Sequence, residues 1–209
     1  MNVRPYLIGI AGGSASGKTS LSNKIQEALS VDCTVISTDC FYKDLTPSQL
    51  LEVAEYNFDH PDAFDFIEMN QALWKLLHCE EVNVPIYDYT RCRRSDSFIA
   101  AKPTQFVILE GIMALYDPKI RDMIDLKIFV HTDSDECLAR RIIRDTEQRG
   151  RDIHSVIHQY RKFVKPAFDE FIFPMMKFSD IIVPRGAENK IAFDLIIQNL
   201  KIKKNSQDN

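Results

Sequence analysis

The chain has 209 residues, of which 45% are hydrophobic and 27% charged, and its formal net charge is −4. This length and composition predict one large domain, or a domain with an inserted lobe, with enough apolar residues for a substantial core. The negative balance excludes the bulk basic footprint of a nucleic-acid-binding protein, and no apolar run reaches the length of a membrane-spanning helix. We therefore expect neither a nucleic acid polymer nor a membrane among the partners.

The cysteines and the two ends of the chain give expectations about the cellular compartment and about the termini. The five cysteines are odd in number and form no C-x-x-C pair, which predicts reduced thiols and a cytoplasmic location. The N-terminal apolar run is short and leads directly into a glycine motif, so we expect no signal peptide. Residues 201–209 are polar and are expected to form a frayed tail.

A glycine-rich motif near the N-terminus carries the strongest signal. Residues 12–19 fit G-x-x-x-x-G-K-[ST], residues 6–11 before it form an apolar run typical of a buried parallel strand, and residues 21–29 after it have helical apolar spacing. Strand, glycine loop and helix are the context that a phosphate-binding loop requires. The alternative, a glycine-rich turn with an accidental lysine, does not explain both flanks.

The loop motif predicts binding of a nucleoside triphosphate. Its backbone N–H groups and the following helix N-terminus attract phosphate, Lys18 is expected to reach the β- and γ-phosphates, and the Thr19 hydroxyl is expected to bind Mg²⁺. The loop residues predicted to bind ATP are Gly12, Gly13, Ser14, Ala15, Ser16, Gly17, Lys18, Thr19 and Ser20.

Two carboxylates follow predicted strands. A β-branched, apolar segment within residues 31–38 predicts a second strand, which we expect beside the loop and which ends at Asp39, the best candidate for the base that accepts the proton of a hydroxyl substrate. The alternative for Asp39 is a helix cap or turn residue. The apolar run 106–109 ends at Glu110, where a carboxylate that contacts the metal or its water shell is expected.

The remaining elements alternate along the chain. A helix is expected to start near Pro47, another spans residues 67–77, and alternation over 82–101 predicts a hairpin off the main sheet. Further strands (126–130, 181–183) and helices (135–149, 152–171, 187–200) follow. This order predicts an α/β fold, a doubly wound parallel sheet of the P-loop kinase type with a β-hairpin lobe and a helical lid, forming a single domain over residues 1–200.

A dense basic segment lies on the predicted lid, at about residues 140–170. Arg140, Arg141 and Arg144 share part of one helix face, and Gly150 interrupts the run before Arg151. Planar guanidinium groups suit phosphate oxygens, so a helix–hinge–helix with arginines is typical of a lid that closes over a triphosphate. The alternative for one or two of these arginines is a solvated face paired with nearby carboxylates.

Aromatic and acidic residues around the loop at 58–65 and the hairpin are candidates for holding a nucleoside. Tyr42, Phe58, Tyr87 and Tyr89 are candidates for stacking on a planar base, although each alone is more often a core aromatic. Asp59 is a candidate acceptor for a ribose diol, whereas Asp62 and Asp65 are expected to be caps.

Seven stretches together resemble the uridine–cytidine kinase family over nearly the whole chain. They are Gly12–Lys18 (GGSASGK), Asp39–Tyr42 (DCFY), Asn57–Asp65 (NFDHPDAFD), Pro85–Asp88 (PIYD), Arg149–Asp152 (RGRD), Lys165–Phe168 (KPAF) and Pro184–Asn189 (PRGAEN). The segments NFDHPDAFD and KPAF are far more specific than the phosphate loop, which many unrelated proteins share.

The resemblance implies transfer of the ATP γ-phosphate, with Mg²⁺, to the 5′-hydroxyl of uridine or cytidine, giving UMP or CMP in pyrimidine salvage. It implies Asp39 as base, Asp59 on the ribose hydroxyls and Tyr87 at the nucleobase. It also implies that the lid residues Arg144 and Arg149 contact ATP and that Glu188 lies near its adenine. On the acceptor side, Arg141 and Gln159 hold the base and sugar, and Arg151 lies near the acceptor. The resemblance further implies a homotetramer.

One position departs from the family pattern. A histidine that commonly follows the Tyr–Asp pair and contacts the pyrimidine edge is replaced by Cys92, a weak donor and acceptor, and Tyr89 stands where phenylalanine is usual. Two alternatives therefore stay open: a P-loop kinase for another small hydroxyl acceptor, and a non-catalytic ATP-binding regulator.

Overall fold

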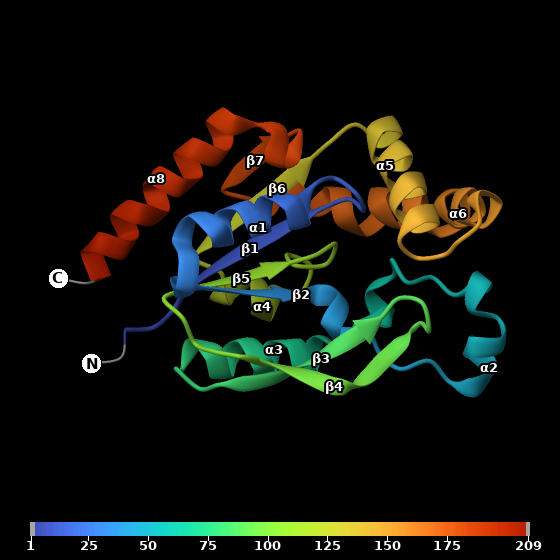
Figure 1. Cartoon of the computed structure of the whole chain (residues 1–209), viewed down its shortest axis with the longest axis horizontal. Coiled ribbons are helices and arrows are strands. Elements are labelled where there is room, and N and C mark those ends of the chain that lie inside the picture. The colour runs from blue at the N-terminus through green and yellow to red at the C-terminus, as the bar shows by residue number, and fades with distance from the viewer. Residues whose placement is uncertain (1–2, 208–209) are drawn as a thin grey trace.

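The computed structural model describes residues 3–207 and contains a five-stranded parallel sheet with helices on both faces (Figure 1). The strand order is β2-β5-β1-β6-β7, which confirms the predicted doubly wound sheet. The strands are β1 (Tyr6–Gly12), β2 (Cys33–Ser37), β5 (Phe106–Glu110), β6 (Leu126–His131) and β7 (Ile181–Pro184).

The helices follow the predicted order, with α4 as an additional helix that was not predicted and with differences in two of the others. They are α1 (Lys18–Leu29), α2 (Pro47–Leu51), α3 (Phe66–Leu77), α4 (Pro118–Met123), α5 (Ser134–Glu147), α6 (Ile153–Gln159), α7 (Lys165–Ala167) and α8 (Lys190–Gln207). The predicted helix over residues 152–171 contains two wider π-type turns on either side of α7, where Pro166 lacks the N–H that a regular turn needs. Helix α8 starts at Lys190 rather than 187 and continues to Gln207, so the segment expected to fray from residue 201 is helical up to there.

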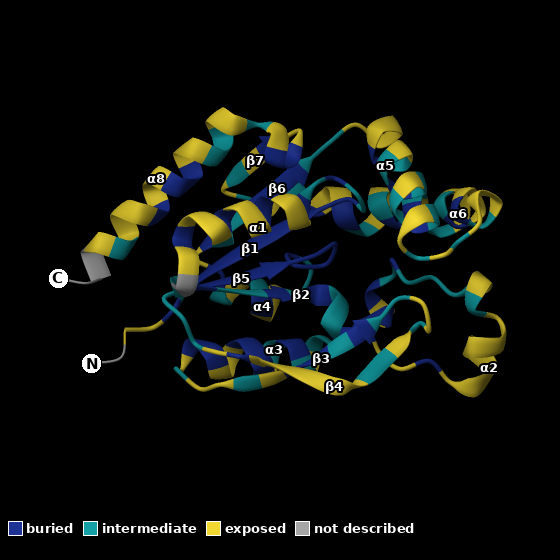
Figure 2. Cartoon of the chain, in the orientation of Figure 1, coloured by how far each residue is buried: buried dark blue, intermediate teal, exposed yellow. Residues whose placement is uncertain are grey.

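Side chains of the central strands alternate between two hydrophobic layers. Along β1, Leu7 and Ala11 belong to the layer that contains α3, whereas Ile8 and Ile10 belong to the layer that contains α1 and α8. Figure 2 shows the central strands as almost continuously buried, with exposed residues on the outer sides of α8 and β4. Burial on both faces explains why these strands are apolar runs in the sequence.

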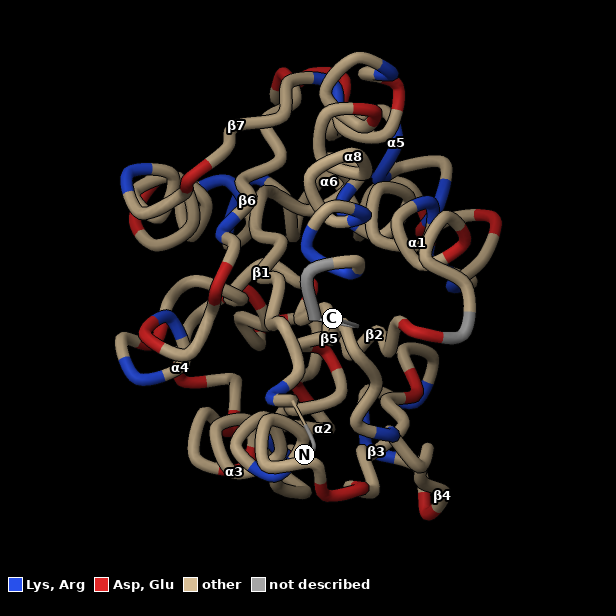
Figure 3. The backbone as a smooth tube through the Cα atoms, turned by 90° about the vertical axis from the view of Figure 1, so that its left-hand side faces the viewer, with Lys and Arg blue, Asp and Glu red and all other residues tan. Residues whose placement is uncertain are grey.

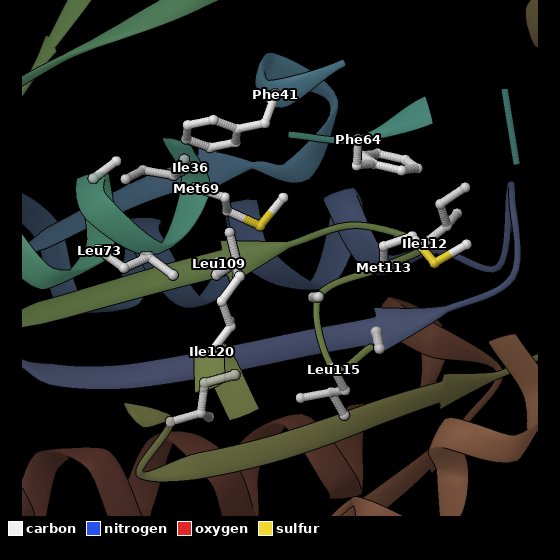
Figure 4. Packing of buried hydrophobic residues seen from close by; sticks show 14 of the residues in the cluster. Ile36, Phe41, Phe64, Met69, Leu73, Leu109, Ile112, Met113, Leu115 and Ile120 are labelled. Carbon is white, nitrogen blue, oxygen red and sulfur yellow. The ribbon is translucent and has the colours of Figure 1, made fainter. Parts of the chain in front are cut away.

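The layer below the sheet links the strands to α3. Figure 4 shows Met69 and Leu73 of α3 packed with Leu109 of β5 and Ile36 of β2, all within one buried cluster. This packing fixes the side of the sheet from which the hairpin extends.

The strand register places three chemically important segments at one edge. Ile10 of β1 and Ser37 of β2 both pair with Glu110 of β5, so the chain segments that leave these strands emerge side by side. They are the phosphate loop, the turn that contains Asp39, and Gly111. Strand β2, expected beside the phosphate loop, does not pair with β1, which leads into that loop, because β5 lies between them. The parallel register nevertheless brings the carboxyl ends of β1 and β2 to the same edge.

The predicted hairpin is a separate two-stranded antiparallel sheet, β3 (Val82–Asp88) and β4 (Arg93–Ala101). Arg94 fastens it to the main domain: its Nε donates to the Tyr42 carbonyl oxygen at 2.7 Å, and its Nη1 lies 2.7 Å from a carboxylate oxygen of Glu68 on α3. The hairpin is therefore held against the edge that contains Asp39.

Charges of both signs are interspersed along the backbone in Figure 3, in keeping with the small net charge. Over residues 3–207 we find no helix with the length and apolarity needed to cross a bilayer. All five cysteines have free thiols, and burial, aided by Asp39, raises the pKa of Cys40 to about 11.

The first prediction concerns Gly111, which turns the chain after β5 with a φ of 156°. A Cβ there would lie 1.7 Å from Thr38 Oγ1, so Gly111→Ala is expected to lower the free energy of unfolding by about 2–6 kcal/mol through strain and overlap. Gly150→Ala is the matched control, because Gly150 also has a positive φ but nothing lies within 4 Å of its Cβ position; its cost is expected to be about 1–2 kcal/mol. Urea denaturation measures both, and equal losses would contradict this account of the β5 turn.

Candidate active site

A cavity of about 690 Å³ lies at the edge where the strands end, between the phosphate loop, the hairpin and the arginine-bearing helices. Most of the residues singled out from the sequence line it: Ser14, Ala15, Gly17, Lys18, Thr19, Ser20, Asp39, Tyr42, Phe58, Asp59, Tyr87, Cys92, Glu110, Arg141, Arg144, Arg149, Arg151, Gln159 and Glu188. Gly12, Gly13 and Ser16 belong to the same loop but do not line the cavity.

The phosphate loop is closed by its own lysine. Lys18, the first residue of α1, is buried, and its Nζ donates to the Gly13 carbonyl oxygen at 2.7 Å. Burial lowers the pKa of Lys18, and the carboxylates of Glu110 and Asp39 oppose that shift. The loop thus presents a buried cation beside two carboxylates, with the N-terminus of α1 directed at the same space.

Thr19 and Glu110 form a pair of oxygen donors that fits Mg²⁺. The Thr19 hydroxyl donates to Glu110 Oε1 at 3.2 Å, and burial raises the pKa of Glu110 while Lys18 lowers it. Within residues 3–207 no cluster of three or more His, Cys, Asp or Glu side chains suits a metal. One hydroxyl and one carboxylate match the way Mg²⁺ binds, because that ion takes few protein ligands and completes its shell with phosphate and water oxygens.

Asp39 lies in a short 3₁₀ turn, Thr38–Phe41, at the end of β2. It is not the cap of that turn: Ser37 Oγ caps it by accepting from the Asp39 N–H at 3.2 Å, so the Asp39 carboxylate is free to face the cavity. Its Oδ2 accepts a hydrogen bond from the Tyr89 hydroxyl at 2.8 Å. A carboxylate held in this way suits proton abstraction from a substrate hydroxyl.

Aromatic rings form the wall opposite the phosphate loop. The ring of Tyr42 lies 5.8 Å from Phe58, 4.9 Å from Tyr87 and 4.4 Å from the core residue Phe64, measured between centroids. The wall is therefore anchored in the core on one side and borders the cavity on the other, as a stacking surface requires.

Of the two expected caps, Asp65 caps α3, whereas the side chain of Asp62 is 92% exposed and caps nothing.

Asp59 is buried at the same wall, with 6% of its surface exposed. Burial raises the pKa of this carboxyl, and the positive charge of Arg141 lowers it. A buried carboxylate near the positive charges of Arg141, Lys18 and Arg144 still has acceptor capacity for two hydroxyl groups of a ligand.

Residues 7–192 match the family described as Phosphoribulokinase / Uridine kinase family. The chain is 48% identical to uridine kinase-like protein 5 of Arabidopsis thaliana over 96% of its own length and 43% of that protein, and 42% identical to uridine-cytidine kinase 2-B of Danio rerio over 95% and 80%.

The chain belongs to the phosphoribulokinase/uridine kinase family. It spans less than half the length of the Arabidopsis relative. The solved phosphoribulokinase from Rhodobacter spheroides matches its fold, with a TM-score of 0.65 at 17% identity over 88% of this chain and 71% of that one.

In this family member one buried carboxylate holds together three arginines of α5 and the segment directly after it. Asp145 on α5 is fully buried; its Oδ1 lies 2.8 Å from Arg144 Nε and 3.5 Å from Arg149 Nη1, and its Oδ2 lies 3.5 Å from Arg141 Nε. Burial opposes ionisation of Asp145, but the combined attraction of the three guanidinium groups outweighs it and lowers the pKa of the carboxyl. Arg141 also donates to Ser14 Oγ at 2.8 Å, which ties the lid to the phosphate loop.

The other lid residues form two further pairs. Arg140 bonds to Glu136 and to Glu188, each at 2.7 Å, so it is the arginine for which the solvated-face alternative holds best. Arg151 donates to Gln159 Oε1 at 2.7 Å, and it also opposes the rise that burial causes in the pKa of Cys92.

Sequence analysis missed several residues that line the cavity. They are Ser37, Tyr56, Gly111, Ile112, Phe163 and Val164, together with Arg140 and Tyr89, which were considered but not counted as site residues. Asp145 was considered only as a surface partner. Its spacing of four residues from both Arg141 and Arg149 is a signal for its role, but its complete burial is a tertiary property.

The second prediction concerns Asp145→Asn. This change removes the negative charge that three guanidinium groups share, so the free energy of unfolding is expected to fall by about 1–3 kcal/mol at pH 7. Because the folded pKa lies below the ordinary value of 3.8, the stabilisation is complete above about pH 4 and is lost as pH falls through the folded pKa. The difference between the two proteins should therefore shrink in acid.

Denaturation by urea from pH 7 to pH 3 measures the effect of Asp145→Asn. Asp62→Asn is the control, because that carboxylate is exposed, and it should change the free energy of unfolding by less than about 0.5 kcal/mol. An Asp145→Asn protein as stable as the control at pH 7 would show that the cluster does not depend on this charge.

Proposed function

We propose that the protein transfers the γ-phosphate of ATP to the 5′-hydroxyl of uridine or cytidine, forming ADP and UMP or CMP. The observation that carries the proposal is the position of Asp39, which lines the same cavity as the phosphate-loop lysine Lys18 and the aromatic wall. Relatives named as uridine-cytidine kinases in Danio rerio and Dictyostelium discoideum, each 42% identical over 95% of the chain, support the same acceptor.

The phosphate donor is held by charge and by backbone amides. Lys18 exchanges its bond to the Gly13 carbonyl for the β- and γ-phosphate oxygens of ATP. Arg144 and Arg149, already gathered around Asp145, contact the transferred group from the lid side. Glu188, paired with Arg140, lies beside the adenine.

Mg²⁺ belongs to the same proposal, with Thr19 and Glu110 as its protein partners. When bound, the ion neutralises negative charge on the β- and γ-phosphates. Glu110 is buried and accepts a hydrogen bond from the Thr19 hydroxyl, which holds that hydroxyl in place.

The acceptor lies between the aromatic wall and Asp39. Tyr42, Phe58 and Tyr87 contact the faces and edge of the nucleobase, and Asp59 accepts hydrogen bonds from the ribose 2′- and 3′-hydroxyls. Asp39 then receives the proton of the 5′-hydroxyl as its oxygen attacks the γ-phosphorus.

The polar edge of the base faces a different set of groups. Arg141 and Gln159 hold the base and sugar, Arg151 approaches the acceptor, and Cys92 lies beside them. Burial raises the pKa of Cys92, so its thiol is neutral at pH 7. Its one S–H donates to the Tyr89 carbonyl oxygen at 3.6 Å, which leaves the sulfur as a weak acceptor. The homotetramer, the cytoplasmic location and the division into a domain with hairpin lobe and lid stay predictions.

The third prediction tests the reaction itself. With ATP and Mg²⁺, a coupled assay of ADP formation is expected to show turnover that depends on uridine or cytidine and exceeds the turnover with other hydroxyl acceptors, such as ribulose 5-phosphate and pantothenate. A preference for another acceptor would move the protein to the first alternative. The absence of turnover with every acceptor at millimolar concentration would leave only the ATP-binding regulator.

The fourth prediction concerns Asp39→Ala. Loss of the general base is expected to lower kcat by about 10²–10⁴-fold, while ATP affinity stays nearly unchanged because the phosphate loop is intact. Steady-state kinetics and a fluorescent-nucleotide binding assay measure the two effects. A parallel loss of ATP binding would assign Asp39 to the donor site instead.

A further inference from the structure

Tyr89 joins three parts of the molecule that meet at the cavity. It lies in the hairpin turn directly after β3, its hydroxyl donates to Asp39 Oδ2 at 2.8 Å, and the guanidinium carbon of Arg149 lies 3.9 Å above the centre of its ring. The hairpin, the end of β2 and the lid thus contact one side chain. Packing on the aromatic wall and on Arg149 needs only the ring of Tyr89, so its hydroxyl group requires a separate explanation.

The backbone around Tyr89 is held in one conformation. Asp88 Oδ1 accepts hydrogen bonds from the N–H groups of Thr90 at 2.9 Å and Arg91 at 3.1 Å, and the Cys92 thiol donates to the Tyr89 carbonyl oxygen at 3.6 Å. The ring of Tyr89 packs edge-on against Tyr87, with centroids 5.4 Å apart. The position of the phenol oxygen is therefore set by the turn and by the aromatic wall.

The phenol is a fixed donor at neutral pH. Burial raises the pKa of Tyr89, and the adjacent Asp39 carboxylate raises it further, so the hydroxyl keeps its proton. A donor on Oδ2 restricts rotation of the carboxylate and leaves Oδ1 as the acceptor for a substrate proton. Arg149 is also fixed, because its other contact is the buried Asp145.

We infer that Tyr89 is a positioning residue that aims Asp39 Oδ1 at the acceptor hydroxyl through its own hydroxyl group and supports the lid arginine Arg149 through its ring. The inference rests on the proposed function, in which Asp39 is the base. It assigns separate tasks to the two parts of one side chain, and single substitutions distinguish them.

Tyr89→Phe removes the hydroxyl and keeps the ring. It is expected to lower kcat by about 10–100-fold, because a misdirected base costs catalysis without costing binding, and to leave KM for ATP and nucleoside within about twofold. Tyr89→Leu removes the ring as well and is expected to raise KM for ATP in addition. Tyr116→Phe is the matched control, since this tyrosine packs on Phe66 and Phe171 away from the cavity and its loss of a hydroxyl should change no kinetic constant by more than about twofold.

A double-mutant cycle identifies the carboxylate through which Tyr89 acts. In an Asp39→Ala background, Tyr89→Phe is expected to lower kcat by less than about twofold, because the group that it positions is missing. In the wild-type background the same change has its full effect. Wild-type kcat in Tyr89→Phe, or an equal loss in both backgrounds, would overturn the inference, and a raised nucleoside KM with unchanged kcat would make Tyr89 a binding residue instead.

A double-mutant cycle on the melting temperature tests the Tyr89–Asp39 link independently of the proposed function. Without ligands, the decreases in Tm caused by Tyr89→Phe and Asp39→Ala are expected to be non-additive, because both changes remove the same hydrogen bond. If the wild-type protein turns over no nucleoside, the proposed function fails, while non-additive Tm changes still support the Tyr89–Asp39 link. Additive changes overturn the inference whatever the activity.

Discussion

The site depends on the parallel register of β2, β5 and β1. Because Ser37 and Ile10 both pair with Glu110, β2 and β5 end level with one another, and β1 continues two residues further to Gly12. The segments that follow the three strands therefore lie at the same edge. The phosphate loop, the proposed metal-binding carboxylate Glu110 and the proposed base Asp39 are thereby brought to one edge of the sheet. The order β2-β5-β1 also explains why Glu110 lies between the other two and influences Lys18.

Across the cavity from this edge, the arginines of α5 and of the segment after it are held in place by charge. A single buried carboxylate, Asp145, gathers Arg141, Arg144 and Arg149, whose mutual repulsion would otherwise separate them. The guanidinium groups are thus held in place before a phosphate group binds. Because they are preorganised, they lose little conformational entropy when they bind that anion. The wider turns beside Pro166 and the open position of Gly150 are the places where the backbone of this region departs from a regular helix.

Much of the fold, including the loop around Lys18, could be predicted from local sequence patterns. Strands buried on both faces leave continuous apolar runs, and the motif around Lys18 fixes strand, loop and helix together, so the sheet and the phosphate loop followed directly. The neighbour of β2 could not be predicted in this way, because strand order depends on crossover connections rather than on any one segment. The same limit applies to Asp145 and Tyr89: their residue types and spacing are visible in the sequence, but the burial of one and the reach of the other to Asp39 arise only in the folded chain. The continuation of α8 to Gln207 also escaped prediction, because a polar helix end has the composition of a frayed tail.

The central claim is that a nucleoside hydroxyl lies between Asp39 and the γ-phosphate. A crystal structure with uridine and a non-hydrolysable ATP analogue tests it most directly. The account predicts the 5′-oxygen about 2.6–3.2 Å from a carboxylate oxygen of Asp39 and in line with the γ-phosphorus, with the triphosphate on the loop that contains Lys18. A nucleoside bound with its 5′-oxygen directed away from Asp39, or a triphosphate outside that loop, would contradict it.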